Sequence, residues 1–422
     1  MNRTLFFKTS AAGARNMGDK NRNMGMSRVL TATSVIIIIV LAVTSFMRNG
    51  VYRDPVRLWE DAATKSPAKT RVLNNLGSAY AARNRLDAAI EKYNIALAAS
   101  PESAVTYYNR GLAYSRQEKF EKAVEDYTRA ISREPGMDAH YYADRGSAYA
   151  KLGKRDLALA DYEKSLSIDP SQASTYYNRA AVFDAEGLPD RAFGDYTKAT
   201  ELDPANAGAW VKRSAYLLSK GRLDEAIRVC TLGVSANPGS ADLYINRGFA
   251  NAGLGKGQAA IEDYTRAIAL NPGSAEAYAK RGLAYAGSNK LDSAIVDYTE
   301  AITLRPDYAE AYNNRGLAYA ANGRYDKAIE DYNRAVSLKQ YNLDAYLNRG
   351  VAFALSKKYA EAITDFDMVI KLAPWDARGY ANRGFTYFTK GSLKEALPDL
   401  RKACDMKYQN ACGLLQKALR MK

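Results

Sequence analysis

The stretch "AYNNRGLAYAANGRYDKAIEDYNRA" at residues 311–335 decides the fold, because the chain repeats it at a constant interval. Its first part returns as "YYNRGLAY" at 107–114, "YYADRGSAY" at 141–149 and "AYLNRGVAF" at 345–353. Aligned on the glycine of Asn-Arg-Gly, successive copies are 34 residues apart, with a single interval of 35. The aligned residues are Gly77, Gly111, Gly146, Ala180, Ser214, Gly248, Gly282, Gly316, Gly350 and Gly384. A fixed period of this length predicts an all-α solenoid of stacked helical units.

The residue types within one period predict two antiparallel helices, A and B. When the glycine is numbered position 8, position 20 is Ala in every copy, position 24 is mostly Tyr and position 32 is mostly Pro. Positions 4, 8 and 11 share one stripe of helix A, and positions 20, 24 and 27 share one stripe of helix B. Small residues at 8 and 20 allow the two helices to approach closely, and Pro at 32 ends helix B. The tyrosines are therefore interpreted as core residues.

These positions resemble the tetratricopeptide repeat (TPR) family over ten repeats at residues 70–408. Repeats 5 and 8 depart from its pattern, with Ser214 and Cys230 in the former and Gln340 in the latter. A half repeat with helix B only is expected at 53–69, and a capping helix at 409–422. The resemblance implies a right-handed superhelix of antiparallel helix pairs, which binds proteins or extended peptides and has no catalytic activity of its own.

The N-terminal region predicts a membrane anchor. Residues 29–47 contain no charged side chain. The length of this uncharged segment is near the ~20 residues that a spanning helix needs. The basic segment 1–28 before it is expected to be a disordered tail. The positive-inside rule then places the N-terminus in the cytoplasm and the repeats outside it, in the periplasm if the source is bacterial. A cleavable signal peptide is the alternative.

Composition excludes several classes of function. The net charge of +14 is concentrated at the two ends of the chain, so no basic face for nucleic acid is expected on the repeats. A single His among 422 residues argues against most metal and acid–base sites. The stretch "GLGKGQ" at 253–258 lacks the spacing of a phosphate-binding loop. We expect no catalytic residues, metal, cofactor or small-molecule substrate.

The Arg of Asn-Arg-Gly is predicted to be structural. Position 7 is Arg in nine repeats, and eight of these have Asp at position 23. Both positions flank the packing stripe of their helix by the same angle, so the side chains can meet across the helix pair. Repeat 5 is the exception, since Arg213 is accompanied there by Val229. The pattern predicts one structural ion pair in each of the other eight.

The Asn of the triplet, at position 6, is the candidate binding residue. It lies about 160° from the packing stripe of helix A, so packing alone does not explain it. Side-chain amides both donate and accept, as a peptide backbone requires. The row resembles the asparagine ladder of the TPR domain of O-linked N-acetylglucosamine transferase, which implies an extended peptide held in the concave groove. Neutral solvated residues are the alternative interpretation. The candidates are Asn75, Asn109, Asn178, Asn246, Asn314, Asn348 and Asn382.

Two further predictions concern the partner and the cysteines. A clamp for a peptide carboxylate is rejected, because Asp144 stands where a cation is needed. The segment "ACDMKYQNAC" resembles the cysteine spacing of disulfide-rich relatives of TPR, which implies a bridge between Cys404 and Cys412; two free thiols are the alternative. The chain is thus predicted to be a membrane-anchored scaffold for proteins or peptides, or alternatively a substrate-recruiting accessory of an envelope glycosyltransferase or secretion machine.

Overall fold

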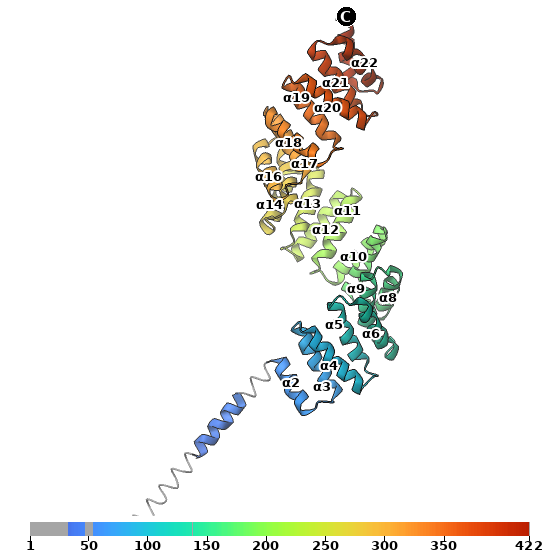
Figure 1. The fold of residues 1–422 in the computed structure, drawn as a ribbon, viewed down its shortest axis with the longest axis vertical. Helices are drawn as coiled ribbons and strands as arrows, with labels where there is room; N and C mark the ends of the chain where they lie inside the picture. The colour runs from blue at the N-terminus through green and yellow to red at the C-terminus, as the bar shows by residue number, and fades with distance from the viewer. Residues whose placement is uncertain (1–32, 47–53, 137, 422) are drawn as a thin grey trace, which may run out of the picture. The chain divides into compact units, whose positions relative to one another are not determined.

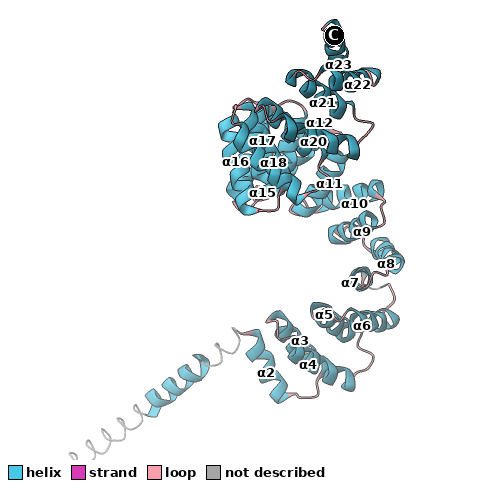
Figure 2. Ribbon diagram, turned by 45° about the horizontal axis from the view of Figure 1, so that its top comes forward, coloured by secondary structure: helices cyan, strands magenta, loops and turns pink. Residues whose placement is uncertain are grey.

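The computed structural model describes residues 33–46, 54–136 and 138–421, and all regular structure in these ranges is α-helical (Figure 2). The chain divides into two compact units, Met1–Val182 and Phe183–Lys422. Within each unit the helices follow one another in chain order (Figure 1), and each helix packs against its neighbours along the chain.

The helices alternate between A and B positions of the repeats. The A helices are α3 (Thr70–Ala82), α5 (Ala104–Arg116), α7 (Ala139–Lys151), α9 (Ala173–Ala185), α11 (Ala207–Ser219), α13 (Ala241–Gly253), α15 (Ala275–Gly287), α17 (Ala309–Ala321), α19 (Leu343–Leu355) and α21 (Ala377–Lys390). The B helices are α4 (Leu86–Ala99), α6 (Phe120–Arg133), α8 (Arg155–Ile168), α10 (Pro189–Leu202), α12 (Leu223–Ala236), α14 (Gly257–Leu270), α16 (Leu291–Leu304), α18 (Tyr325–Leu338), α20 (Tyr359–Leu372) and α22 (Leu393–Asp405). The flanking helices are α2 (Pro55–Lys65) and α23 (Gln409–Arg420).

Local signals set the ends of these helices. Helix α16 ends at Leu304, two residues before Pro306, whose ring is incompatible with a continuing helix. Helix α15 begins after Ser274, whose hydroxyl accepts the backbone N–H of Ala277 at 3.2 Å. Between A and B helices the chain turns through a residue in the left-handed region, such as Gly323 with φ of 70°.

The core of most repeats is a contact between a small residue on helix A and an aromatic ring on helix B, with Cys230 and Leu400 in the place of the ring in repeats 5 and 10. A Cβ atom built on Gly316 would lie 2.6 Å from Cε1 of Tyr332, and Tyr332 is itself fully buried. Ala328, one turn before that ring on α18, is also fully buried. The position-24 tyrosines of the other repeats are buried in the same way, which confirms that they are core residues: Tyr93, Tyr127, Tyr162, Tyr196, Tyr264 and Tyr298.

We predict that Gly316→Val destabilises the fold by about 1–3 kcal/mol, because the added side chain must displace the buried Tyr332 ring. The matched control is Gly194→Val on α10, where an added Cβ has no neighbour within 4 Å. The control is expected to change the free energy of unfolding by less than about 0.5 kcal/mol. Urea denaturation measures both. Equal costs for the two substitutions would contradict this account of the core.

The flanking helices cover the two ends of the repeats. Val56 of α2 is buried in a cluster with Leu76 and Tyr80 of α3, and Trp59 packs against the same cluster. At the other end, Ala411 and Ala418 of α23 are buried against α22. Both helices place an apolar stripe on an otherwise open repeat, as terminal helices of a solenoid must.

The predicted membrane anchor at 29–47 is contradicted by the structure. Its described part is a helix at residues 33–46. No helix in the described residues is long and apolar enough to cross a membrane. The predicted single-pass topology, with a cytoplasmic N-terminus and the repeats outside the cytoplasm, is therefore wrong. The predicted tail at 1–28 lies outside the described residues.

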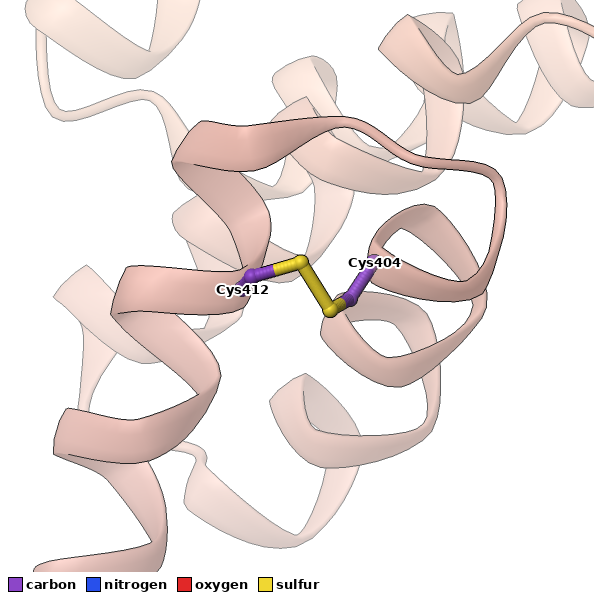
Figure 3. The surroundings of a disulfide bond; sticks show 2 residues. All are labelled: Cys404 and Cys412. Carbon is purple, nitrogen blue, oxygen red and sulfur yellow. A yellow bond between two sulfur atoms is a disulfide. The ribbon is translucent and has the colours of Figure 1, made fainter.

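The three cysteines have different environments. Cys404 of α22 and Cys412 of α23 form a disulfide with an S–S distance of 2.01 Å, which joins these two helices across their connecting turn (Figure 3). Cys230 of α12 is a free, fully buried thiol. Burial raises the pKa of the Cys230 thiol to about 11, so almost none of it is thiolate near neutral pH.

This arrangement predicts the outcome of a thiol titration at pH 8. The native protein should react with essentially no thiol reagent, the unfolded unreduced protein with one equivalent, and the unfolded reduced protein with three. Three equivalents without reduction would show that Cys404 and Cys412 are free. Rapid reaction of the native protein would contradict the burial of Cys230.

Candidate functional site

In most repeats the Arg of the triplet is held by a bidentate ion pair inside its own repeat. On α15, Arg281 donates from Nε and Nη2 to the two carboxylate oxygens of Asp297 on α16, at 2.7 and 2.8 Å. Its Nη1 donates to the hydroxyl of Thr265 on α14, at 3.1 Å. The Asp297 side chain is 3% exposed and that of Arg281 is 16% exposed, and this pairing raises the pKa of Arg281. One guanidinium therefore joins three helices and two repeats.

The same bidentate pair is present in seven repeats, which confirms the predicted structural role. The pairs are Arg110–Asp126, Arg145–Asp161, Arg247–Asp263, Arg281–Asp297, Arg315–Asp331, Arg349–Asp365 and Arg383–Asp399. The third contact, to helix B of the preceding repeat, was not predicted. Its signal is present in the sequence, because position 25 is a short polar residue in most repeats: Asn94, Thr128, Thr231, Thr265, Thr299, Asn333 and Asp367.

Repeat 5 keeps the Arg without the carboxylate. Arg213 donates from Nη1 to the hydroxyl of Thr200 at 3.1 Å, but its buried Nε has no hydrogen-bond partner. Burial lowers the pKa of Arg213, in contrast to the paired arginines. Val229 occupies the place of the missing Asp.

We predict a non-additive double-mutant cycle for Arg281 and Asp297. Arg281→Leu should cost about 3–5 kcal/mol, because it strands a buried carboxylate, whereas the double variant with Asp297→Leu should cost much less. Arg213→Leu is the matched control, since no carboxylate depends on that guanidinium, and it should be nearly neutral. Thermal or urea unfolding measures the wild type, both single variants of the cycle, the double variant and the control. Additive costs would refute the structural role of the pairs.

The candidate Asn side chains lie on the opposite face of the A helices and are half-buried. Four of them donate hydrogen bonds to the A helix of the preceding repeat. Asn246 Nδ2 lies 2.9 Å from Ser214 Oγ, and Asn348 Nδ2 lies 3.0 Å from Asn313 Oδ1. In the first unit, Asn109 reaches Asn74 Oδ1 at 3.1 Å and Asn178 reaches Ser147 Oγ at 3.4 Å. The fold thus uses several of these amides to join successive repeats, which the sequence did not predict.

These bonds use only part of each amide. In Asn246 and Asn348 the bond is made by Nδ2, and no described residue donates to either Oδ1. Asn314 accepts from its neighbour Asn313 at 3.4 Å, within the same helix. The described residues give the side chains of Asn75 and Asn382 no hydrogen bond. Within the described residues, the carbonyl oxygens of Asn75, Asn246, Asn348 and Asn382 thus remain for a ligand N–H, whereas that of Asn314 already accepts one bond. The bonds between repeats hold several amides in fixed orientation.

Apolar side chains accompany the Asn row in repeats 6–10, and the sequence analysis missed them. Position 9 carries Phe249, Leu283, Leu317, Val351 and Phe385, all of which are exposed. Positions 2, 6, 9 and 13 fall within about 60° on helix A, so the apolar and Asn rows share one face. We call the position-2, -6 and -9 side chains of repeats 6–10 the ladder face. The signal was an apolar residue recurring at a position outside the packing stripe.

At the C-terminal end of the ladder face, Asn382 and Phe385 line a hollow of ≈ 650 Å³ together with residues of α23, and two further hollows indent this face. One of ≈ 690 Å³ is lined by Phe249 and Leu283 of the apolar row, Lys280 and Asn314 at position 6, and Glu310 at position 2. A second of ≈ 330 Å³ is lined by Val351, Leu355, Asn382 and Phe385 among other residues. The structure thus brings amides and exposed apolar surface together in single depressions, which is the composition of a ligand-binding surface.

Asp144, which argued against a carboxylate clamp, has a structural role in the first unit. The Tyr108 hydroxyl donates to its Oδ2 at 2.6 Å, joining α5 to α7. Burial raises the pKa of this carboxyl group. A buried acid in this place is incompatible with an anion-binding row there.

The tetratricopeptide repeat family matches this chain at residues 77–118, 146–187, 253–289 and 287–323, and at 104–137 and 309–342. Further matches to the family cover 177–241, 377–410 and 344–374. The chain belongs to the tetratricopeptide repeat family.

Three solved structures illustrate the similarity. The MamA protein is 32% identical, with 40% of this chain and 92% of that one covered and a TM-score of 0.37. YrrB, described as a TPR protein with an unusual peptide-binding site, is 26% identical over 44% of this chain and 95% of its own, with a TM-score of 0.39. The Cut9–Hcn1 structure is 17% identical, covering 89% and 95%, with a TM-score of 0.47. No curated protein matches the chain.

Proposed function

We propose that this protein is a non-catalytic scaffold that binds a protein partner by laying an extended peptide segment of that partner along the Asn row. The observation that carries the proposal is the difference between the two recurring polar rows. The paired arginines are bound to buried carboxylates and to polar side chains of the preceding repeat. The Asn row is half-exposed, keeps unused acceptor atoms and borders exposed apolar side chains.

Backbone chemistry supports an extended peptide as the ligand. An extended chain presents N–H and C=O groups that have no partner within the segment, and a side-chain amide can pair with either group. An amide occupies position 6 in four of the five repeats 6–10, with Lys280 in the other, so the site would contact the peptide backbone in most of these repeats. Contacts of this kind select for extended conformation, while neighbouring side-chain pockets select for sequence.

A photo-crosslinking experiment in native cells tests which face the partner contacts. A photoreactive phenylalanine analogue is placed at Leu283 on the ladder face or at Val296 on α16. These residues are 57% and 61% exposed and belong to the same repeat, so they are matched in accessibility. Discrete adducts are expected from position 283 only. Adducts confined to position 296 would move the binding surface to the B helices and overturn the proposal.

The Asn row is predicted to contribute a few kcal/mol to partner binding. Replacing Asn246, Asn314, Asn348 and Asn382 together by Ala should weaken the affinity for the crosslinked partner by about a hundredfold to a thousandfold, at about 1 kcal/mol for each lost hydrogen bond. Isothermal titration calorimetry measures this change.

Two double variants, each with two of the four substitutions, separate an effect on binding from an effect on stability. Asn246→Ala with Asn348→Ala removes bonds between repeats and should lower the melting temperature as well as the affinity. Asn314→Ala with Asn382→Ala removes no such bond and should lower the affinity alone. If only the first pair weakens binding, in step with its loss of stability, the amides are structural and the proposal fails.

A further inference from the structure

The ladder face carries a third row, of acidic residues, which neither the repeat pattern nor the Asn row requires. Position 2 is acidic and exposed in four consecutive repeats, at Asp242, Glu276, Glu310 and Asp344. Position 2 of the first unit is occupied by Arg71, Val105, His140 and Ser174 instead, and Leu112 is the only large apolar residue at position 9 there. The combination of acidic, Asn and apolar rows is therefore confined to the second unit.

Two of the four acids already have a cation close by. Glu276 lies 3.4 Å from Lys280, and Asp344 lies 3.4 Å from Arg378. For Asp242 and Glu310 the described residues place no cationic nitrogen within 4.0 Å. Glu310 lines the larger hollow beside Phe249 and Leu283, so an unpaired carboxylate and an apolar depression occupy the same place. Lys280 lines that hollow too, with its Nζ 4.9 Å from the centre of the Phe249 ring.

The spacing of the rows limits the kind of peptide that fits. Neighbouring A helices on this face are in direct contact, as the bond between Asn348 and Asn313 shows, and packed helices are about 8–10 Å apart. A polyproline II chain rises ~3.1 Å per residue and has three residues per turn, so every third side chain returns to the same face after ~9 Å. One peptide turn therefore matches one repeat.

We propose that the ladder face of repeats 6–10 binds an extended, polyproline II-like peptide that is apolar at every third residue and cationic between these anchors. The inference rests on the proposed function and adds the chemistry of the ligand. Apolar anchors lie against position-9 side chains and enter the hollow between Phe249 and Leu283. Cationic side chains approach Asp242 and Glu310, and the peptide backbone pairs with the Asn amides.

Three synthetic 15-residue peptides test this inference on the full chain by fluorescence anisotropy. The first is five copies of Leu-Lys-Pro, the second replaces every Lys by Glu, and the third has the composition of the first with its leucines adjacent. We expect the first peptide to bind at least about tenfold more tightly than the other two at low salt. The advantage over the Glu peptide should shrink at 1 M salt, where charges are screened beyond ~3 Å.

Charge variants test whether Asp242 and Glu310 cause the preference for the Lys peptide over the Glu peptide. Asp242→Asn with Glu310→Gln should weaken binding of the Lys peptide about fivefold, as two exposed charge contacts allow, and should improve binding of the Glu peptide. The matched control is Glu300→Gln with Glu330→Gln, an equal change of charge on exposed residues of the B helices α16 and α18. Equal effects of the two pairs would show that only net charge matters and would overturn the assignment.

Apolar variants locate the anchors. Leu283→Asn with Leu317→Asn should weaken binding of all Leu-containing peptides at least about tenfold, whereas Leu232→Asn with Val296→Asn, at comparably exposed sites on B helices, should not. Circular dichroism confirms that each variant is folded. The Lys and Glu peptides could bind equally tightly while Leu283→Asn with Leu317→Asn still weakens the binding of both. In that case the inference about charge fails and the peptide-binding function stands. If no peptide binds, or if the adjacent-Leu peptide binds as well as the first, the proposed ligand is wrong.

Discussion

The close approach of two helices at a small residue is the constraint on which the rest of this structure depends. In the repeats with Gly at position 8 and an aromatic residue at position 24, the ring packs against the glycine where a Cβ atom would be, so the two helices meet closely. That contact fixes the rotation of both helices about their axes. Once the rotation is fixed, position 7 must point toward helix B and position 6 away from the core. The Asn and Arg of the triplet, although adjacent in sequence, therefore have different environments.

The environment of the charged side chains follows from that rotation. Arg at position 7 meets a buried carboxylate of its own repeat and a polar side chain of the preceding one. A buried carboxylate requires a cationic partner that donates hydrogen bonds to it, because an unpaired charge in the interior costs several kcal/mol. Although the chain has an excess of basic residues, its most regular row of arginines is used inside the fold. Recognition of a partner then depends on the face at positions 2, 6 and 9.

The sequence was most informative where a position is constrained by packing. Period, helix pairing, buried tyrosines and the Arg–Asp pairs could all be predicted, because each repeats at a fixed register and has few alternative explanations. The polar contact of Thr265 with Arg281 and the exposed Leu283 were missed, because they join different repeats or lie outside the packing stripe. The membrane anchor was wrong because hydropathy alone does not establish a continuous helix of sufficient length. The bond of Asn246 to Ser214 was not predicted, since it depends on how successive repeats stack.

Methyl-resolved NMR of the full chain during titration with the Leu-Lys-Pro peptide tests the central claim most directly, because it reports on individual side chains of both helix faces at once. The account predicts that the methyl signals of Leu283, Leu317 and Val351 shift with a common binding curve. The signals of Leu232 and Val296, which are equally exposed on the B helices, should remain unchanged. Shifts of Leu232 and Val296 with an unperturbed ladder face would contradict it.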